Sequence, residues 1–99
     1  MPTFRITAKA KADLVSIARY TEDMWGREQR NSYLAKLDES FHLLAEKPHI
    51  GRTCDDIREG YRKYHTGRHL IFYRQSDKDI EIIRILHDRM DIEIHLPET

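Results

Sequence analysis

The first half of the chain carries two helical hydrophobic patterns separated by a glycine. Between about residues 8 and 25, small and hydrophobic side chains recur at the spacing of one helix face, namely Ala10, Leu14, Ile17, Ala18, Thr21 and Met24. Between about residues 27 and 47, a second face is built in the same way by Leu34, Leu37, Phe41 and Leu44. Gly26 ends the first helix and Pro48 stops the second. The short link between them predicts an antiparallel helical hairpin.

The second half of the chain shows the alternation of β-strands. Residues 70–75 alternate with the period of two that is typical of a strand. Residues 80–87 form a hydrophobic run that is rich in β-branched side chains and too short for a membrane helix, which predicts a buried strand. Polar residues 76–79 and the Thr66-Gly67 pair are typical of tight turns, so residues 61–87 predict three antiparallel strands.

A short strand is also expected at the start of the chain. Residues 3–7 place Phe4 and Ile6 on one face, and Thr7 is a suitable N-cap for the helix that follows. Neither helix can bury its hydrophobic face alone, so the sheet must supply the second layer. The expected fold is α+β, with a short N-terminal strand, an antiparallel helical hairpin and then a three-stranded antiparallel sheet, in one domain over residues 1–99.

Charge and composition narrow the function classes. Lys plus Arg and Asp plus Glu both number 17, so the net charge of zero gives no general attraction to nucleic acid or anionic membranes. Seven of the eleven arginines nevertheless lie between Arg52 and Arg89, which allows a local basic surface. The single cysteine, Cys54, excludes an intramolecular disulfide and a cysteine-based zinc site.

Targeting and cofactor signals are absent from the sequence. The N-terminus lacks the apolar segment of a signal peptide, and no run has the length of a membrane span. There is no HExxH motif, P-loop or GxGxxG motif, and the histidines do not form a metal-ligand pattern. We therefore expect a soluble cytoplasmic protein without a metal or cofactor.

Short motifs along nearly the whole chain resemble those of the ParE family of toxins, within the RelE/ParE superfamily. In the second half they are Gly60–Arg62, Gly67–His69, Ile71–Arg74, Ile83–His87 and Met90–Asp91. In the first half the matching positions include Trp25-Gly26, Leu44-Ala45, Pro48 and Gly51. The resemblance implies a growth-inhibiting toxin of a type II toxin–antitoxin module that traps DNA gyrase on cleaved DNA. It also implies a cognate, ParD-like antitoxin as partner, and no sequence-specific binding of nucleic acid.

A toxin that traps gyrase without chemistry of its own needs a contact surface, for which Arg and aromatic anchors are typical. The candidates that we infer are Trp25, Arg62, Arg68, Arg74, Arg84, His87, Arg89, Met90 and Ile92. Two readings stay open for Arg84, which interrupts a hydrophobic strand. It either faces solvent or pairs with a carboxylate such as Glu59 or Glu81, or it belongs to a concave surface that reads phosphate or a partner.

Antitoxins of this kind usually present a segment that folds on binding, and such a segment fits a hydrophobic groove. We expect the groove between the helical hairpin and the sheet edge, lined by partly exposed Ala18, Thr21, Tyr33, Leu37 and Tyr61. The hypothesis depends most on Tyr33 and Tyr61, whose hydroxyls suit a wet groove edge. For Leu37 a place in the core is the competing interpretation.

The main alternative is a ribosome-dependent mRNA endoribonuclease of the RelE type. Cleavage needs a base, an acid and cations, and the sequence offers Arg62, Arg68, Arg84, His87, Tyr73 and Glu59 for these roles. RelE-type toxins carry a dense Lys and Arg surface, whereas this chain has only Lys63 and Lys78 beyond residue 47. A third class is a binding module, such as a degenerate toxin that only neutralises a foreign antitoxin.

Overall fold

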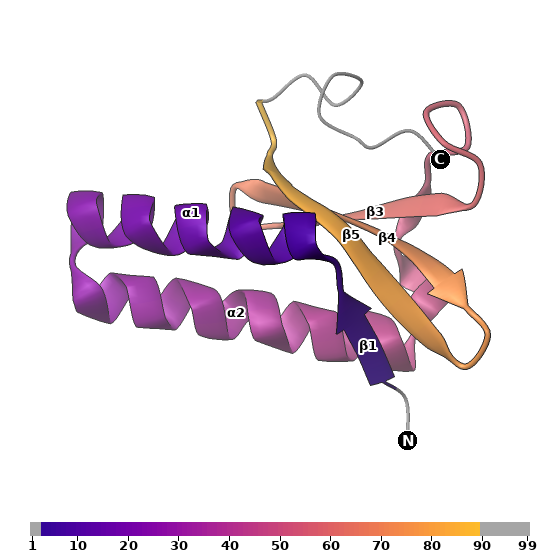
Figure 1. Cartoon of the computed structure of the whole chain (residues 1–99), viewed down its shortest axis with the longest axis horizontal. Coiled ribbons are helices and arrows are strands. Elements are labelled where there is room, and N and C mark those ends of the chain that lie inside the picture. Colours follow the sequence, from indigo (N-terminus) through magenta and orange to yellow (C-terminus); the bar gives the residue numbers. More distant parts are fainter. Residues whose placement is uncertain (1–2, 90–99) are drawn as a thin grey trace.

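The computed structural model of the chain describes residues 3–89 and has the expected α+β fold (Figure 1). Its elements, in chain order, are β1 (Thr3–Ile6), α1 (Ala8–Trp25), α2 (Arg27–Glu46), the short 3-10 helix η1 (Pro48–Ile50), β2 (Arg52–Thr53), β3 (Tyr61–Thr66), β4 (His69–Ser76) and β5 (Asp79–His87). In the part of the chain that the structure describes, neither helix combines the length and hydrophobicity needed to cross a membrane.

The helical hairpin begins and ends where the sequence predicts. The Thr7 hydroxyl accepts a hydrogen bond from the Ala10 backbone N–H at 3.1 Å, which confirms Thr7 as the N-cap of α1. Gly26 joins the two helices with φ +94°, a backbone conformation that favours glycine. Met24 does not belong to the buried face, because it is 57% exposed near the hairpin tip, which extends beyond the sheet in Figure 1.

The sheet has five strands in the order β1-β5-β4-β3-β2. Strands β3, β4 and β5 form the predicted antiparallel meander, with two-residue turns at 67–68 and 77–78. Strand β1 lies parallel to β5, where Phe4 pairs with Ile80 and Ile6 with Ile82. Because β1 stops at this point, the outer edge of β5 beyond Ile82 faces the start of α1.

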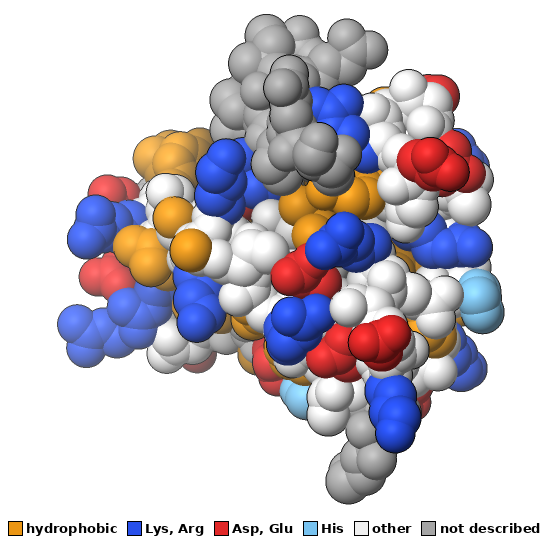
Figure 2. Space-filling model, turned by 45° about the vertical axis from the view of Figure 1, so that its right-hand side comes forward, with side chains coloured by type: hydrophobic (Ala, Val, Ile, Leu, Met, Phe, Trp, Pro, Cys, Tyr) orange, Lys and Arg blue, Asp and Glu red, His pale blue; other side chains and the backbone are white. Residues whose placement is uncertain are grey.

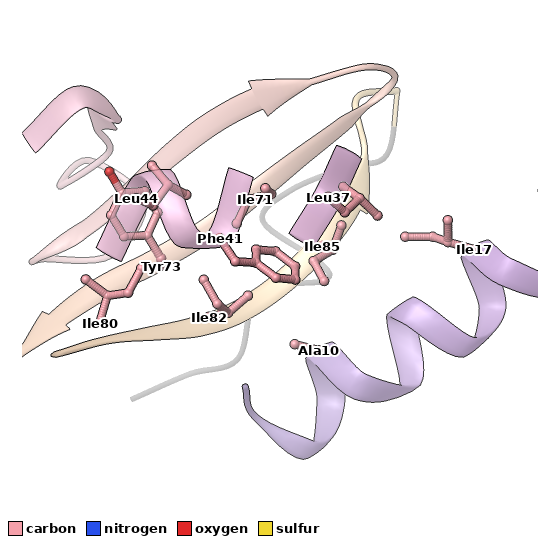
Figure 3. Packing of buried hydrophobic residues seen from close by; sticks show 10 residues of the cluster. All are labelled: Ala10, Ile17, Leu37, Phe41, Leu44, Ile71, Tyr73, Ile80, Ile82 and Ile85. Carbon is pink, nitrogen blue, oxygen red and sulfur yellow. The ribbon is translucent and has the colours of Figure 1, made fainter. Parts of the chain in front are cut away.

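The helical hairpin covers one face of the sheet and encloses the main core (Figures 1 and 3). The buried members of this core are Ala10, Ile17, Leu37, Phe41, Leu44, Ile71, Tyr73, Ile80, Ile82 and Ile85. Figure 3 shows the Phe41 ring beside Ile82 and Ile85 of β5, and its centroid lies 5.5 Å from that of Phe4. The predicted hydrophobic face of α2 is therefore confirmed as the central contact between helix and sheet.

The opposite face of the sheet carries a second, smaller cluster. Its buried members are Cys54, Tyr61, Phe72, Ile83 and Leu86, with Ile57 and Leu70 packed against them. A bulge between β4 and β5 at Phe72/Tyr73 lets Ile83 face this cluster while Ile82 and Ile85 face the helices. The loop before β3 covers the cluster, and burial there raises the pKa of the Cys54 thiol, which disfavours a reactive thiolate.

Candidate functional site

A shallow depression lies at the edge of the sheet where β2 pairs with β3, and it reaches the end of β5. It has a volume of about 760 Å³ and is lined by Ile50, Arg52, Lys63, Tyr64, His65, Leu70, Asp88 and Arg89. Three of these side chains are permanent cations, one is a carboxylate, and Ile50 and Leu70 are hydrophobic. We call this surface the basic depression.

Arg52 and Lys63 bring two positive charges together in the basic depression. They occupy directly opposite positions in the antiparallel register of β2 and β3. Like charges in opposite positions of a sheet destabilise the pair. Within residues 3–89 neither side chain forms an ion pair, so no carboxylate of this part of the chain contacts either charge directly. This pair could not be predicted from the sequence, because a strand of two residues has no detectable periodicity.

Asp88 is the carboxylate of the basic depression and is already engaged. One of its oxygens lies 3.2 Å from His65 Nε2, and the other lies 3.4 Å from His87 Nδ1. Its backbone N–H donates to the Arg68 carbonyl at 3.0 Å, which ties the end of β5 to the β3–β4 turn. The Asp88 charge is therefore directed to two histidines rather than to Arg52 or Lys63.

A cluster of Tyr33, His69 and His87 lies behind this turn, on the side of α2. Tyr33 Oη lies 2.5 Å from His69 Nδ1 and accepts a hydrogen bond from the Arg68 backbone N–H at 3.1 Å. The ring centroids of His69 and His87 are 5.5 Å apart. Oη accepts from the Arg68 N–H and can also donate its proton to Nδ1, an arrangement that uses a neutral His69 ring with Nδ1 unprotonated. Burial of the ring lowers the pKa of His69, and the neighbouring His87 lowers it further.

Protonation of His69 is expected to destabilise the fold. The pKa of His69 is lowered in the folded state and stays at about 6.5 in the unfolded state, so below that pH the unfolded chain binds more protons. Stability is then lost as the pH falls from about 6.5 through the folded pKa, with a slope of at most about 1.4 kcal/mol per pH unit. Urea unfolding of the wild type and of His69→Gln from neutral to acidic pH measures this. His42→Gln, at an exposed position, is the control; equal slopes in all three proteins would contradict the assignment.

Arg84 is part of a buried bridge between the sheet and α1. Its Nε and Nη2 donate to the two carboxylate oxygens of Asp13 at 2.7 and 2.9 Å, and the Ile85 backbone N–H donates to Asp13 at 2.9 Å. The two side chains are only 16% and 14% exposed. The hydrogen bonds to Asp13 raise the pKa of Arg84. The expectation of a carboxylate partner is thus confirmed, but Glu59 and Glu81 were the wrong choices.

The other proposed gyrase contacts are spread over the molecule. Trp25 is 68% exposed at the hairpin tip, and Arg68 is exposed in the β3–β4 turn. Arg62 Nη1 donates to the Gly51 carbonyl at 2.8 Å, and Arg74 Nε lies 3.0 Å from Glu81. Of the candidates among the described residues, Arg89 alone lines the basic depression. His87 lies beside it and contacts Asp88, which also lines the depression. Met90 and Ile92 lie outside the described residues.

The burial of three of its proposed lining residues contradicts the predicted antitoxin groove. Leu37 and Tyr61 are 1% and 3% exposed, and Thr21 is buried, with its hydroxyl donating to the Ile17 carbonyl at 2.7 Å. Tyr61 belongs to the cluster on the sheet face opposite the helices, because strand alternation directs it away from Tyr64 and the main core. A single groove lined by both Tyr33 and Tyr61 is therefore wrong. Tyr33 and Ala18 are half-buried, as expected.

The residues named for ribonuclease chemistry do not converge. Tyr73 is fully buried on the helix-facing side, where its hydroxyl donates to the Pro48 carbonyl at 2.7 Å and accepts from the Gly51 N–H at 3.0 Å. Glu59 is exposed in the loop before β3, and Arg84 is held by Asp13. Within residues 3–89 no group of three or more His, Cys, Asp or Glu side chains is arranged to hold a metal ion.

Comparison with known proteins places this architecture among bacterial toxins. Residues 4–92 match the family model described as the ParE toxin of the type II toxin–antitoxin system parDE. The chain is 40% identical over 96 residues to Toxin ParE1 of Caulobacter vibrioides, covering 97% of this chain and 99% of that protein. It is also 40% identical over 94 residues to Toxin ParE1 of Mycobacterium tuberculosis, covering 94% of this chain and 96% of that protein.

A solved structure supports the fold. The structure described as the chromosomal ParDE TA system from P. aeruginosa superimposes with a TM-score of 0.75 at 24% identity, covering 88% of this chain and 96% of that one. A helical hairpin on one face of a mostly antiparallel sheet is thus shared with a toxin–antitoxin protein. The chain belongs to the ParE toxin family of type II toxin–antitoxin systems.

Proposed function

We propose that this chain inhibits DNA gyrase by stabilising the complex of the enzyme with cleaved DNA, and that a ParD-like antitoxin neutralises it. The observation that carries the proposal is the match to ParE toxins over nearly the whole chain. The engagement of Tyr73 and Arg84 within the fold also supports inhibition by contact rather than by chemistry. The toxin would act in the cytoplasm, where gyrase works.

The contact with gyrase would use two exposed regions. The first is the hairpin tip, where the hydrophobic side chains of Tyr20, Met24 and Trp25 are 57–68% exposed. Large exposed aromatic residues are the side chains that most often anchor a protein interface. The second is the end of β5, with Arg68, His87 and Arg89, followed along the chain by Met90 and Ile92. Arg84 is less suited to direct contact, because its guanidinium is turned to Asp13.

The antitoxin would bind mainly on the helical hairpin. Ala18 and Tyr33 remain half-buried there and provide small and aromatic contacts for an amphipathic segment. Acidic side chains of the antitoxin would pair with exposed cations nearby, such as Arg19 and Lys36. Thr21, Leu37 and Tyr61 are left out of this surface because they are buried.

Supercoiling and cleavage assays with purified gyrase, run beside in vitro translation, test the function. We expect the toxin to block supercoiling and to accumulate cleaved DNA, while messenger RNA stays intact, and we expect the antitoxin to reverse the effect. Trp25→Ala should weaken gyrase inhibition relative to Glu39→Ala, an exposed change on α2.

The same experiment tests the RelE-type alternative. The His65–Asp88 pair beside Arg52 and Lys63 combines an acid–base group with cations, which favours the RNA-cleavage alternative. If the toxin stops translation and cuts messenger RNA, and if His65→Ala slows cleavage by roughly 10²-fold or more, the gyrase proposal is wrong.

A further inference from the structure

We propose that the basic depression binds backbone phosphates of DNA, so that the toxin contacts the cleaved DNA as well as the gyrase protein. This inference rests on the proposed function, since it assigns the surface that meets the DNA in the trapped complex. It concerns Arg52, Lys63 and Arg89, of which only Arg89 was suggested by the sequence.

The charge arrangement is the main argument. Arg52 and Lys63 lie opposite one another on β2 and β3, and Arg89 reaches the same depression from the end of β5. The fold thus gathers three cations from three separate segments of the chain. Side chains of like charge that repel one another in the free protein gain from an anion placed between them. Arg and Lys are the residues that most often contact backbone phosphates.

The neighbouring acidic group cancels only part of this field. Asp88 lies within ion-pair distance of His65 and His87, and its single negative charge leaves an excess of positive charge from Arg52, Lys63 and Arg89. On the face shown in Figure 2, both acidic and basic side chains are present. In this chain of zero net charge, the basic depression gathers three cations beside one carboxylate.

The shape of the depression also suits a nucleic-acid backbone. The depression is open rather than enclosed, and the side chains of Ile50 and Leu70 provide hydrophobic contact beside the cations. An open cationic surface contacts the sugar–phosphate backbone without reading base edges, so binding should be independent of sequence. The expected affinity is modest and becomes useful once gyrase has placed the DNA beside the toxin.

Fluorescence anisotropy of a short labelled DNA duplex with the purified toxin tests this site. If three cations each contact one phosphate, affinity should fall by about 40-fold between about 50 and 200 mM salt. Arg52→Glu combined with Lys63→Glu should abolish most binding, and the residual binding should change by only about 3-fold over the same salt range. The control with the same charge change is Arg27→Glu combined with Lys78→Glu, at exposed positions outside the depression. It should bind DNA within about 2-fold of the wild type.

Circular dichroism and binding to the antitoxin check that each variant is folded. The double variant Arg52→Gln with Lys63→Gln repeats the test by removing the two charges without reversing them. Equal DNA binding by the site variant and the control would overturn the proposal. Loss of antitoxin binding in the site variants, with DNA binding intact, would instead assign the depression to an acidic peptide and would also overturn it. If the wild type traps gyrase but binds no DNA at low salt, the phosphate site fails and the proposed function stands. Failure to inhibit gyrase would instead reject the proposed function.

Discussion

Replacing Asp13 by alanine is expected to lower the free energy of unfolding by about 3–5 kcal/mol. The carboxylate accepts two hydrogen bonds from the Arg84 guanidinium and a third from the Ile85 backbone N–H. Both charged side chains are mostly buried, so the change removes two charge-assisted hydrogen bonds from a largely desolvated guanidinium. It also removes the acceptor of a strand N–H at the edge of β5 that β1 does not cover.

Chemical denaturation at neutral pH measures this effect, with Asp23→Ala as the control on the same helix. Asp23 is exposed, so its replacement should change stability by no more than about 0.5 kcal/mol. The paired change Asp13→Leu with Arg84→Met should recover much of the loss, because it removes both charges together. A value for Asp13→Ala close to that of Asp23→Ala would show that the bridge does not stabilise the fold in solution.

Phe41→Ala is expected to cost about 3–5 kcal/mol, because it opens a cavity between the hairpin and the sheet. Phe41 is 3% exposed, and its ring packs against that of Phe4 on β1. Its position in the C-terminal half of α2 places it beside Ile82 and Ile85 of β5 (Figure 3). The side chain therefore joins all three parts of the fold: the first strand, the helical hairpin and the antiparallel sheet.

Thermal and urea unfolding of Phe41→Ala should be compared with Glu39→Ala, which changes an exposed residue of the same helix. Phe41→Leu should lose less than Phe41→Ala, since it leaves a smaller cavity. If the melting temperature of Phe41→Ala equals that of Glu39→Ala, the core does not have the arrangement described above.

The helices and most strands could be predicted from the sequence because local interactions determine them. The Thr7 cap, the Gly26 link and the residues before Pro48 set the helix ends within a few positions, and each depends only on neighbours in the chain. The alternation in residues 70–75 and the hydrophobic run that follows likewise predicted β4 and β5. The family resemblance could also be detected from the sequence, since it rests on short motifs spread along the whole chain.

The tertiary structure alone decided the features that join distant segments. Asp13 and Arg84 are 71 residues apart, and nothing local to either residue shows that α1 crosses the edge of β5. Three other features have the same origin. They are the parallel pairing of β1 with β5, the opposite positions of Arg52 and Lys63, and the burial of Tyr61 on the sheet face opposite the helices. Each depends on strand order and register, which are set by packing of the whole sheet against the hairpin rather than by the residues themselves.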